Sequence, residues 1–308
     1  MNILVLGGAG YIGSRLRQHL AEKHNVESVD CCWFTYDNDS IRKDYNNLTV
    51  AELGKYHAVI LLAGHSSVKS CEGDIKSPWL NNVTNFTNLL GKLRNDQLVI
   101  YASSASVYGN SLPGELHSEK TVNFVPVNHY DVTKYALDQQ AIIANLQGKQ
   151  VIGLRFGTVN GWSPRLRVDV MINAMYETSV QQKRPIQVFN AKINRALLGI
   201  EDLCRAIDTC IDNPMTGIYN LASFNSTVGE IANTVANTLQ VKIENKGNTA
   251  NVYDFALDTT LFSNTFGFTF RETPVTIVDS LIQKYSDCKV TRRDTYMTYN
   301  WEKINERR

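Results

Sequence analysis

The sequence lacks the features that mark several large classes of protein. Its apolar runs are no longer than a β-strand, whereas a transmembrane helix needs about 20 apolar residues. The 31 Lys and Arg residues nearly balance the 30 Asp and Glu residues, which leaves a formal net charge of +1. No basic stripe is present, so electrostatics give no reason to expect binding to nucleic acid or to an anionic membrane. We therefore expect neither partner.

Cysteine and histidine patterns typical of metal sites are also missing. The six cysteines include no C-x-x-C pair and the six histidines no H-E-x-x-H pattern, so we predict no metal site. Scattered cysteines without a disulfide framework favour the reducing cytoplasm. A serine hydrolase is not expected, because Ser104 lacks the G-x-S-x-G context. The 308 residues, of which 43% are hydrophobic, suffice for one large domain or two modest ones.

The most informative segment is an apolar strand that leads directly into three spaced glycines, Gly7, Gly10 and Gly13. In a strand–turn–helix, one such glycine makes the tight turn, another admits a pyrophosphate and the third lets the helix pack on the strand. The helix N-terminus presents free N–H groups and the positive end of its dipole to the phosphates. The motif predicts a dinucleotide site that includes Tyr11 and Ile12.

An acidic residue ends the second apolar segment. Asp30 lies about 20 residues after Gly10, where dinucleotide-binding folds place the carboxylate that accepts a hydrogen bond from the ribose 2′-OH. The same carboxylate repels a 2′-phosphate, and the next basic residue is Arg42. The sequence therefore predicts NAD as the cofactor rather than NADP.

Apolar, strand-like segments alternate with helical stretches such as residues 135–146 through the first half of the chain. This alternation predicts an α/β fold with a Rossmann-type, doubly wound parallel sheet covered by helices on both faces. Residues 227–230 have the sequence of a capping box, which predicts a helix start in the second half. The strand-like segments are residues 3–6, 26–29, 58–63, 98–102 and 151–156.

After Gly161 the alternation becomes irregular and prolines separate shorter elements. The family resemblance described below implies that this half forms a smaller C-terminal α/β domain that binds the substrate. Residues 1–160 are assigned to the NAD-binding domain, with 188–213 returning to it. Residues 161–187 and 214–308 are assigned to the substrate-binding domain.

Tyr130 and Lys134 stand four residues apart, so they share a face if the segment is helical. A lysine ammonium beside a phenol favours the phenolate and is expected to lower the pKa of Tyr130 from about 10. Tyr130 then serves as a general base or acid near neutral pH, while Lys134 also holds the nicotinamide ribose. Ser104 follows an apolar strand and is expected at the carboxyl edge of the sheet, where ligands bind. It would hydrogen-bond the substrate hydroxyl whose proton Tyr130 removes.

These motifs resemble the extended short-chain dehydrogenase/reductases, specifically the NAD-dependent epimerase/dehydratase family, which acts mostly on nucleotide sugars. The resemblance covers most of the chain and is most specific up to Lys134. It implies a Rossmann domain with a small substrate domain, a catalytic trio of Ser104, Tyr130 and Lys134, and a homodimer formed through the helix that carries Tyr130. The matching residues are Gly7, Gly10, Gly13, Asp30, and segments 62–64, 81–83, 103–109, 130–134, 154–156, 163–165 and 195–202.

The resemblance also implies which residues contact the cofactor. Asp44 and Tyr45 correspond to the pair that brackets the adenine. Ala63 and Gly64 correspond to the loop under the nicotinamide. Asn82 corresponds to an asparagine on the cofactor side.

At the substrate end, Arg195 corresponds to the arginine that grips the diphosphate of a sugar nucleotide, a role suited to a guanidinium fork. Thr158 replaces an asparagine that often contacts the substrate. Tyr253 stands near the position where a second phosphate-binding arginine is expected. Arg165 and Arg167 are candidates to compensate for it, with surface charge as the alternative reading of both.

Ala105 and Ser106 occupy the positions where 4,6-dehydratases of the family carry Asp-Glu, so dehydration lacks its acid–base pair. Ser106 is instead counted with Ser104 among the substrate-binding residues. The leading hypothesis is an NAD-dependent nucleotide-sugar epimerase that acts at C4 of a UDP-sugar by transient hydride transfer to NAD. An NAD(P)-dependent sugar-nucleotide reductase or dehydrogenase and a non-catalytic NAD-binding sensor remain as alternatives.

Overall fold

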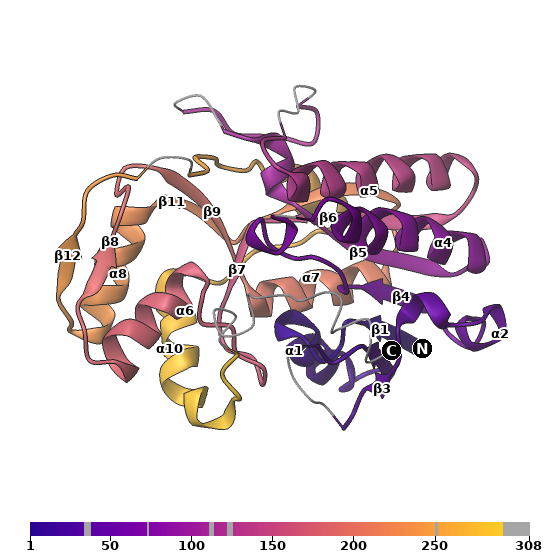
Figure 1. Ribbon diagram of the computed structural model, residues 1–308, viewed down its shortest axis with the longest axis horizontal. Coiled ribbons are helices and arrows are strands. Elements are labelled where there is room, and N and C mark those ends of the chain that lie inside the picture. Colours follow the sequence, from indigo (N-terminus) through magenta and orange to yellow (C-terminus); the bar gives the residue numbers. More distant parts are fainter. Residues whose placement is uncertain (34–37, 73, 111–113, 122–125, 250–251, 292–308) are drawn as a thin grey trace.

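The computed structural model describes residues 1–33, 38–72, 74–110, 114–121, 126–249 and 252–291. In these residues a seven-stranded parallel sheet forms the centre of the molecule, in the order β10-β6-β5-β4-β1-β2-β3 (Figure 1). Its strands are β1 (Asn2–Leu6), β2 (Asn25–Asp30), β3 (Ile41–Arg42), β4 (Ala58–Leu61), β5 (Leu98–Ser104), β6 (Gln150–Phe156) and β10 (Gly217–Leu221). The order runs outward in both directions from β1, which is the arrangement of a doubly wound sheet.

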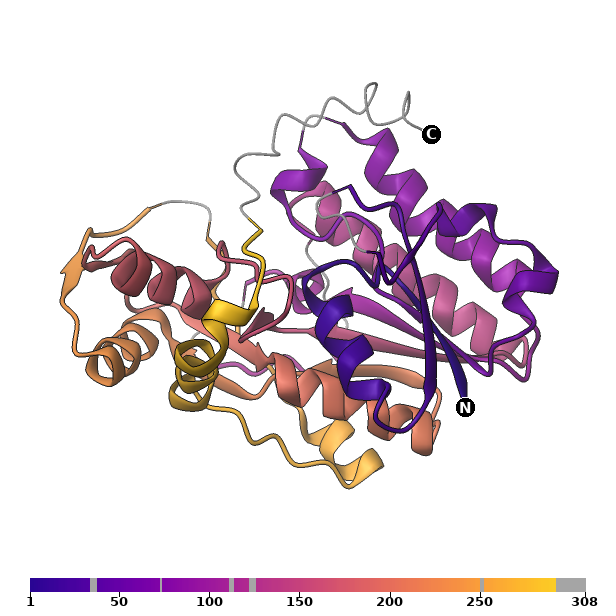
Figure 2. The ribbon, with the colours of Figure 1, turned by 90° about the horizontal axis from the view of Figure 1, so that it is seen from below.

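Helices cover both faces of this sheet (Figures 1 and 2). The helices α1 and α7 pack together on one face, and α4 and α5 lie on the other. Because both faces are covered, β1 is apolar along its length, with Ile3 and Val5 in one core cluster and Leu4 and Leu6 in the other. The main helices here are α1 (Tyr11–Leu20), α4 (Asn85–Lys92), α5 (His129–Leu146) and α7 (Ile200–Asp212), with short α2 (Val50–Leu53) and α3 (Lys76–Pro78).

A second, smaller group of elements lies beside the carboxyl end of the sheet (Figure 1). Its strands form a three-stranded sheet, β11-β9-β7, and a two-stranded sheet, β12-β8. The helices α6, α8 and α10 pack against one another there, while α9 packs against β10. The bounds are β7 (Thr158–Asn160), β8 (Ile186–Val188), β9 (Asn194–Gly199), β11 (Phe224–Thr227), β12 (Ile243–Asn245), α6 (Met171–Tyr176), α8 (Val228–Leu239), α9 (Thr260–Phe266) and α10 (Pro274–Lys284).

The Rossmann-type fold predicted from the sequence is confirmed, whereas the predicted boundaries need correction in two places. The strands β7 and β9 fall in ranges 1–160 and 188–213, assigned to the NAD-binding domain, but they pair with each other in the smaller three-stranded sheet. The strand β10, at residues 217–221, was assigned with 214–308 to the substrate domain, but it pairs in parallel with β6 at the edge of the central sheet. Its inner residues are buried against that sheet, so it extends the same core. The predicted capping box is present: Thr227 accepts from the Glu230 N–H, and the Glu230 carboxylate accepts from the Thr227 N–H at the start of α8.

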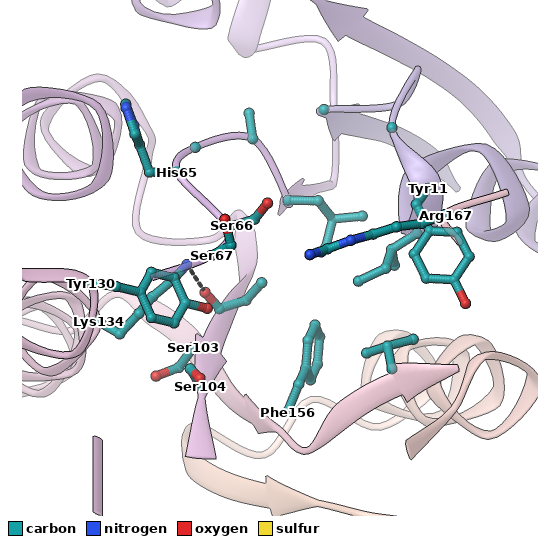
Figure 3. Close-up of a pocket in the computed structure, with 18 of the residues that line it drawn as sticks. Tyr11, His65, Ser66, Ser67, Ser103, Ser104, Tyr130, Lys134, Phe156 and Arg167 are labelled. Carbon is teal, nitrogen blue, oxygen red and sulfur yellow. Dashed lines mark hydrogen bonds between the residues drawn. The ribbon is translucent and has the colours of Figure 1, made fainter. Parts of the chain in front are cut away.

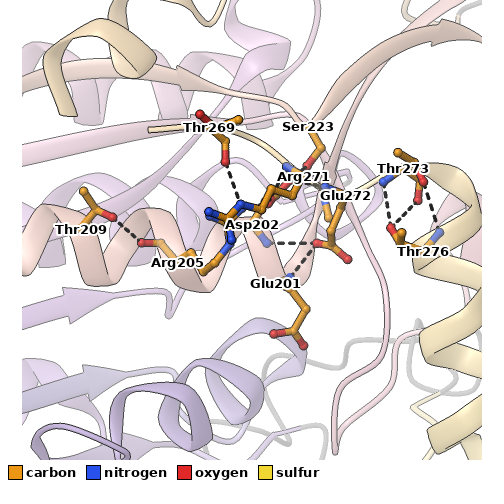
Figure 4. Close-up of polar contacts among 11 residues, drawn as sticks. Glu201, Asp202, Arg205, Thr209, Ser223, Thr269, Arg271, Glu272, Thr273 and Thr276 are labelled. Carbon is orange, nitrogen blue, oxygen red and sulfur yellow. Dashed lines mark hydrogen bonds and ion pairs between the residues drawn. The ribbon is translucent and has the colours of Figure 1, made fainter. Parts of the chain in front are cut away.

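Two carboxylates tie the start of α7 to the segment before α10 (Figure 4). The Glu272 carboxylate accepts from the backbone N–H groups of Glu201 and Asp202, which are among the free donors of the first turn of α7. In return, the buried Asp202 carboxylate accepts from the N–H groups of Arg271 and Glu272. Burial raises the pKa of Glu272 to about 7, since it disfavours the charged form. Each segment therefore satisfies backbone donors of the other.

Candidate active site

A cavity of about 400 Å³ opens along the carboxyl ends of the central strands, between the two parts of the fold. Figure 3 shows Tyr130, Lys134 and Ser104 on one side of it, Tyr11 and Arg167 on the other, and Phe156 between the two groups. In parallel α/β sheets, ligands bind in this position, near the strand where the sheet order reverses. The cavity thus lies where the sequence predicts the cofactor and substrate.

The glycine turn between β1 and α1 forms one wall of the cavity, to which Tyr11 and Ile12 also contribute. Gly7 has a φ of +92°, and a Cβ there would lie 2.6 Å from the backbone nitrogen of Ala63. A Cβ on Gly13 would lie 2.2 Å from the Gly7 carbonyl oxygen, which shows how closely the helix approaches the strand. The turn therefore leaves its backbone open to a phosphate, as the motif predicts.

The Tyr11 side chain has a structural role in addition to its place in the wall. Its hydroxyl donates to the Gly161 carbonyl at 2.8 Å, and the Asn173 side-chain amide donates to the same hydroxyl at 3.2 Å. The Ser163 hydroxyl donates to the Tyr11 carbonyl at 2.6 Å. These contacts connect the glycine turn to the segment that carries Arg167.

Asp30 lines the cavity at the carboxyl end of β2, about where the sequence predicts the ribose-binding acid. One of its oxygens accepts from the Ala9 N–H at 3.0 Å and the other from the Cys32 N–H at 2.8 Å. Asp44 and Tyr45 lie further along the same wall. The Asp44 carboxylate accepts from the Asn46 N–H, which caps the short 3-10 helix Tyr45–Asn47.

Ala63 and Gly64 line the cavity after β4, as predicted, but Asn82 does not lie in its wall. The Asn82 side chain accepts from the His65 N–H at 2.8 Å and donates to the His65 carbonyl and to the Thr133 hydroxyl. Asn82 therefore holds the loop that follows β4 against α5. Burial lowers the pKa of the neighbouring His65 to about 4, so that its imidazole is neutral at physiological pH.

The predicted catalytic trio is brought together at one end of the cavity (Figure 3). Ser104 ends β5, and Tyr130 and Lys134 share a face of α5, which begins six residues before the helical stretch predicted from the sequence. The Lys134 ammonium lies 5.8 Å from the centroid of the Tyr130 ring and donates to the Ala102 carbonyl at 2.8 Å. The Ser104 Oγ accepts from the Ser106 N–H at 3.2 Å and lies 2.9 Å from the Ser106 Oγ.

The expectation that Lys134 lowers the pKa of Tyr130 is wrong for the protein alone. Burial raises the pKa of Tyr130 to about 12, because it disfavours the phenolate. The pKa of the Lys134 ammonium is itself lowered to about 8 by burial. The Lys134 ammonium donates to a main-chain carbonyl rather than to the phenol, so it stabilises the Tyr130 phenolate less than the residue spacing implied.

Arg195 and Thr158, which are predicted to bind the substrate, both lie in the cavity wall. The Arg195 guanidinium donates to the Tyr253 carbonyl at 3.1 Å and lies 3.4 Å from the Thr158 hydroxyl, while its buried Nε has no hydrogen-bond partner among the described residues. Burial lowers the pKa of Arg195. A buried cation without a carboxylate partner in the described part of the chain suits an anionic ligand group.

The predicted role of Arg165 is not supported, because Arg167 rather than Arg165 lies in the cavity wall. The Arg167 guanidinium pairs with Asp169 at 2.6 Å and points toward the middle of the cavity (Figure 3). Several further wall residues were not predicted from the sequence. Phe156 could have been found, because it lies at the carboxyl end of a predicted strand, where ligands bind. The others include Trp33, Ser66, Ser67, Val68, Val170 and Phe255.

Two observations test whether this site fits a dinucleotide. The glycine turn is a cradle that a side chain at residue 7 or 13 would fill, and the buried Nε of Arg195 lacks a protein partner in the described residues. The open glycine turn suits a pyrophosphate at a helix N-terminus, and the unpartnered Nε of Arg195 suits a further phosphate. The residues present therefore fit NAD together with a phosphate-bearing substrate.

Comparison with known proteins agrees with this arrangement. Residues 3–222 match the NAD dependent epimerase/dehydratase family, so the chain belongs to that family, whose cofactor is NAD. An uncharacterized UDP-glucose epimerase of Bacillus subtilis (strain 168), YtcB, is 29% identical over 238 residues, covering 70% of this chain and 73% of the relative. ADP-L-glycero-D-manno-heptose-6-epimerase of Pseudomonas aeruginosa is 26% identical over 276 residues, which cover 79% of this chain and 80% of the relative.

Among solved structures, MoeE5 in complex with UDP-glucuronic acid and NAD is similar, with a TM-score of 0.80 and 25% identity. The match covers 93% of this chain and 99% of MoeE5. The family and the relatives make the chain an enzyme, and the two curated relatives named above are both epimerases.

A possible cation cluster lies away from the cavity, between the end of α1 and α7. Ligand atoms of His24, Asp208 and Asp212 lie within 4.8 Å of one another. The Lys23 ammonium already pairs with Asp208 at 2.6 Å and neutralises it, so we assign no metal to the cluster. No helix in the described ranges is long and apolar enough to cross a membrane.

Proposed function

We propose that this protein is a UDP-sugar 4-epimerase. The observation that carries the proposal is the convergence of Ser104, Tyr130 and Lys134 in one cavity, with Arg195 in the wall of the same cavity. Ala105 and Ser106 supply no carboxylate for dehydration next to this trio. The similarity to enzymes that bind UDP-sugars and NAD supports the choice of nucleotide.

In the proposed reaction, Ser104 orients the sugar hydroxyl and Tyr130 takes its proton. Lys134 holds the cofactor ribose and is fixed by the Ala102 carbonyl. Bound NAD would supply a hydride acceptor that is regenerated within each catalytic cycle. The Arg195 guanidinium holds the diphosphate while the oxidised sugar turns, and Tyr130 then returns the proton.

The first experiment releases the small molecules bound to the purified protein for mass spectrometry and incubates the protein with UDP-, dTDP-, GDP-, CDP- and ADP-sugars. The proposal predicts tightly held NAD and conversion of a UDP-sugar to an isomer of unchanged mass. Turnover only with added NAD(P)H would instead indicate a reductase. Conversion of an ADP-heptose alone would reject the UDP assignment, and absence of turnover would favour an NAD-binding sensor.

Asp30 provides a test of cofactor choice. Asp30→Ala is expected to weaken NAD binding about 10- to 100-fold, because the ribose loses a charge-assisted hydrogen bond. It should also reduce the preference for NAD over NADP, since a 2′-phosphate no longer meets a carboxylate. Asp30→Asn is the matched control, which removes the charge but retains an oxygen acceptor for the Ala9 N–H. Binding titrations with both cofactors measure the effect, and an unaltered preference in both variants would refute the assignment.

We further propose a homodimer that forms through α5, with the protein working in the cytoplasm. The inner face of α5 packs on the sheet, while Val132, Ile143 and Leu146 on its outer face are exposed, Leu146 by 84%. Trp79 and Leu80, in a segment that packs against α5, are exposed as well. Contiguous apolar side chains of this kind typically mark a protein interface, and a second copy presents the same surface to itself.

The dimer is tested by light scattering. The wild-type protein is expected to have the mass of two chains, and Ile143→Glu the mass of one, because a charge would be buried without a partner. Ile282→Glu, at an exposed apolar position on α10, is the matched control and should leave the mass unchanged. A wild-type mass of one chain would reject the proposal.

A further inference from the structure

A buried ion pair that the proposed reaction does not use lies one helical turn beyond Lys134. Asp138 of α5 is 0% exposed and Arg155 of β6 is 3% exposed, and neither residue belongs to the cavity wall. The Arg155 Nε donates to one Asp138 oxygen at 2.8 Å, and the Tyr101 hydroxyl donates to the other at 2.8 Å. Because the desolvation of two charges is costly, a buried ion pair adds little to the stability of a fold. Its place in this fold points to a different role.

The sequence makes room for this cluster inside the sheet. Gly153 of β6 pairs with Tyr101 of β5, and a Cβ on Gly153 would lie 2.3 Å from the Tyr101 hydroxyl oxygen. A glycine within a strand often marks such a close approach. Because Gly153 has no side chain, the Tyr101 ring can lie across β6 and its hydroxyl can reach Asp138. This arrangement connects β5 to α5.

The Arg155 guanidinium also reaches the turn that follows Ser104. Ser104 ends β5, and residues 105–108 form a short 3-10 helix that ends at the buried Tyr108. The Arg155 Nη1 donates to the Tyr108 hydroxyl at 2.7 Å, and the Arg155 Cζ lies 4.9 Å from the centroid of the Tyr108 ring. One side chain therefore bridges α5 and the turn after Ser104.

The chemistry of the groups fixes the direction of these hydrogen bonds. A guanidinium only donates, so the Tyr108 oxygen accepts from Arg155 and its own hydrogen goes to the Asn220 side-chain oxygen, at 2.8 Å. The Asn220 side-chain nitrogen donates to the carbonyls of His117 and Asp258, at 2.9 and 3.1 Å. The bridge is thus anchored on β10 as well.

We propose that Arg155 is a positioning residue for the reaction: its guanidinium holds the catalytic helix α5 in place against the turn that follows Ser104. The helix carries Tyr130 and Lys134, so the bridge fixes both residues relative to Ser104. Tyr130 and Ser104 have to reach the same sugar hydroxyl, and a displacement of about 1 Å in a catalytic group can cost about 100-fold in rate. This inference rests on the proposed function for its role in turnover.

The main test is Tyr108→Phe, with its kinetics compared with those of the wild type. The variant keeps the ring and the ion pair but removes the hydroxyl that Arg155 and Asn220 share. We expect kcat to fall about 10-fold while KM changes by less than about 2-fold, because the reacting groups are displaced and the cavity wall, to which Tyr108 does not belong, is intact. A raised KM with an unchanged kcat would contradict the positioning role.

Tyr219→Phe is the matched control. Tyr219 precedes Asn220 in β10, is also buried and lies outside the cavity wall, and its hydroxyl donates to the Met215 carbonyl at 3.1 Å. Either variant loses hydrogen bonds of one tyrosine hydroxyl, so both should lose some stability. Only Tyr108→Phe should lose turnover, and an equal loss of kcat in both variants would overturn the inference.

Arg155→Lys tests whether the planar shape of the guanidinium matters. A guanidinium donates in diverging directions, so Nε serves Asp138 while Nη1 serves Tyr108, whereas an ammonium is a single point charge. The variant keeps the charge and should reproduce the loss of kcat. Arg155→Lys combined with Tyr108→Phe should lose no more than the larger of the two single losses, because both break the same bridge. Additive losses would contradict a shared bridge.

A further pair of variants separates positioning from stability. Arg155→Met leaves the Asp138 carboxylate buried without its cation, so the denaturant midpoint should fall. Adding Asp138→Asn removes the charge and retains an oxygen for the Tyr101 hydroxyl, so the midpoint should recover. Turnover should nevertheless stay about 10- to 100-fold below wild type. Recovery of kcat together with the midpoint would show that the ion pair only stabilises the fold, and would overturn the inference.

A readout independent of turnover separates this inference from the proposed function. Amide hydrogen exchange in the purified protein reports how firmly residues 105–109 and 130–138 are held. Exchange in both segments should become faster in Tyr108→Phe and remain as in wild type in Tyr219→Phe. If no sugar nucleotide reacts but exchange changes in this way, the proposed function fails and the bridge stands. Unchanged exchange in Tyr108→Phe would contradict the bridge itself.

Discussion

Tyr130→Phe is expected to lower kcat by about 1,000-fold or more, because the variant has no group at that point to take or return the hydroxyl proton. The phenylalanine ring fills the same space, and the glycine turn and Asp30 are untouched. Bound NAD should therefore remain in the purified protein. Turnover of the sugar nucleotide and the NAD content after denaturation measure the two effects.

Tyr56→Phe is the matched control for this prediction. The Tyr56 hydroxyl donates to Glu27 at 2.8 Å, and the residue lies outside the cavity wall. Its loss should leave turnover unchanged. If Tyr130→Phe also retained full turnover, Tyr130 would have no part in the reaction. Loss of NAD along with activity would instead show that the phenol holds the cofactor.

Gly13→Ala is expected to abolish NAD retention. The new Cβ would lie 2.2 Å from the Gly7 carbonyl oxygen and 2.8 Å from the Gly8 Cα, distances that real contacts essentially never show. The helix α1 must move away from β1, and its N–H groups then no longer converge on the pyrophosphate. The displaced packing should also lower the free energy of unfolding by about 1–3 kcal/mol, the usual cost of overpacking.

Gly91→Ala separates this effect from the general effect of glycine replacement. Gly91 lies in α4, and a Cβ there meets nothing within 4 Å. The substitution should stabilise the helix by up to about 1 kcal/mol and leave NAD in place. Denaturant unfolding and the NAD content of both variants provide the comparison. A Gly13→Ala protein that retains NAD would show that the turn is not the pyrophosphate site.

The parts of the fold that were predicted correctly depend on local sequence. The strand β4 and residues 3–6 of β1 are apolar and buried because both faces of the sheet are covered. The capping box at Thr227 is a local hydrogen-bond pattern. The edge strand β10 was placed in the wrong part because it follows irregular sequence and joins the sheet only through β6. Pairing partners so distant in sequence leave no local pattern to detect.

Prediction of the candidate active site is limited in the same way by contacts between residues distant in sequence. Residue types and spacing identified the trio and the glycine turn, since each has a chemical motif. The pKa of Tyr130 was misjudged because it depends on burial, and the choice of Arg167 over Arg165 depends on which way the chain turns after Pro164. The hydrogen bonds from Tyr253 to the buried Asp131 left no signal in the sequence, because the two residues are 122 positions apart.

The exchange of hydrogen bonds between Asp202 and Glu272 bears on the order in which this chain can fold during synthesis. The first turn of α7 is capped by a residue that lies 71 positions after Glu201, and the edge strand β10 also follows α7 in the chain. A nascent chain that ends at residue 160 therefore lacks both the edge of its own sheet and the helix that packs against α1. Domains usually fold one after another as they leave the ribosome. In this chain the cofactor-binding half is complete only after nearly all residues have been synthesised. The two halves should therefore fold and unfold as one cooperative unit.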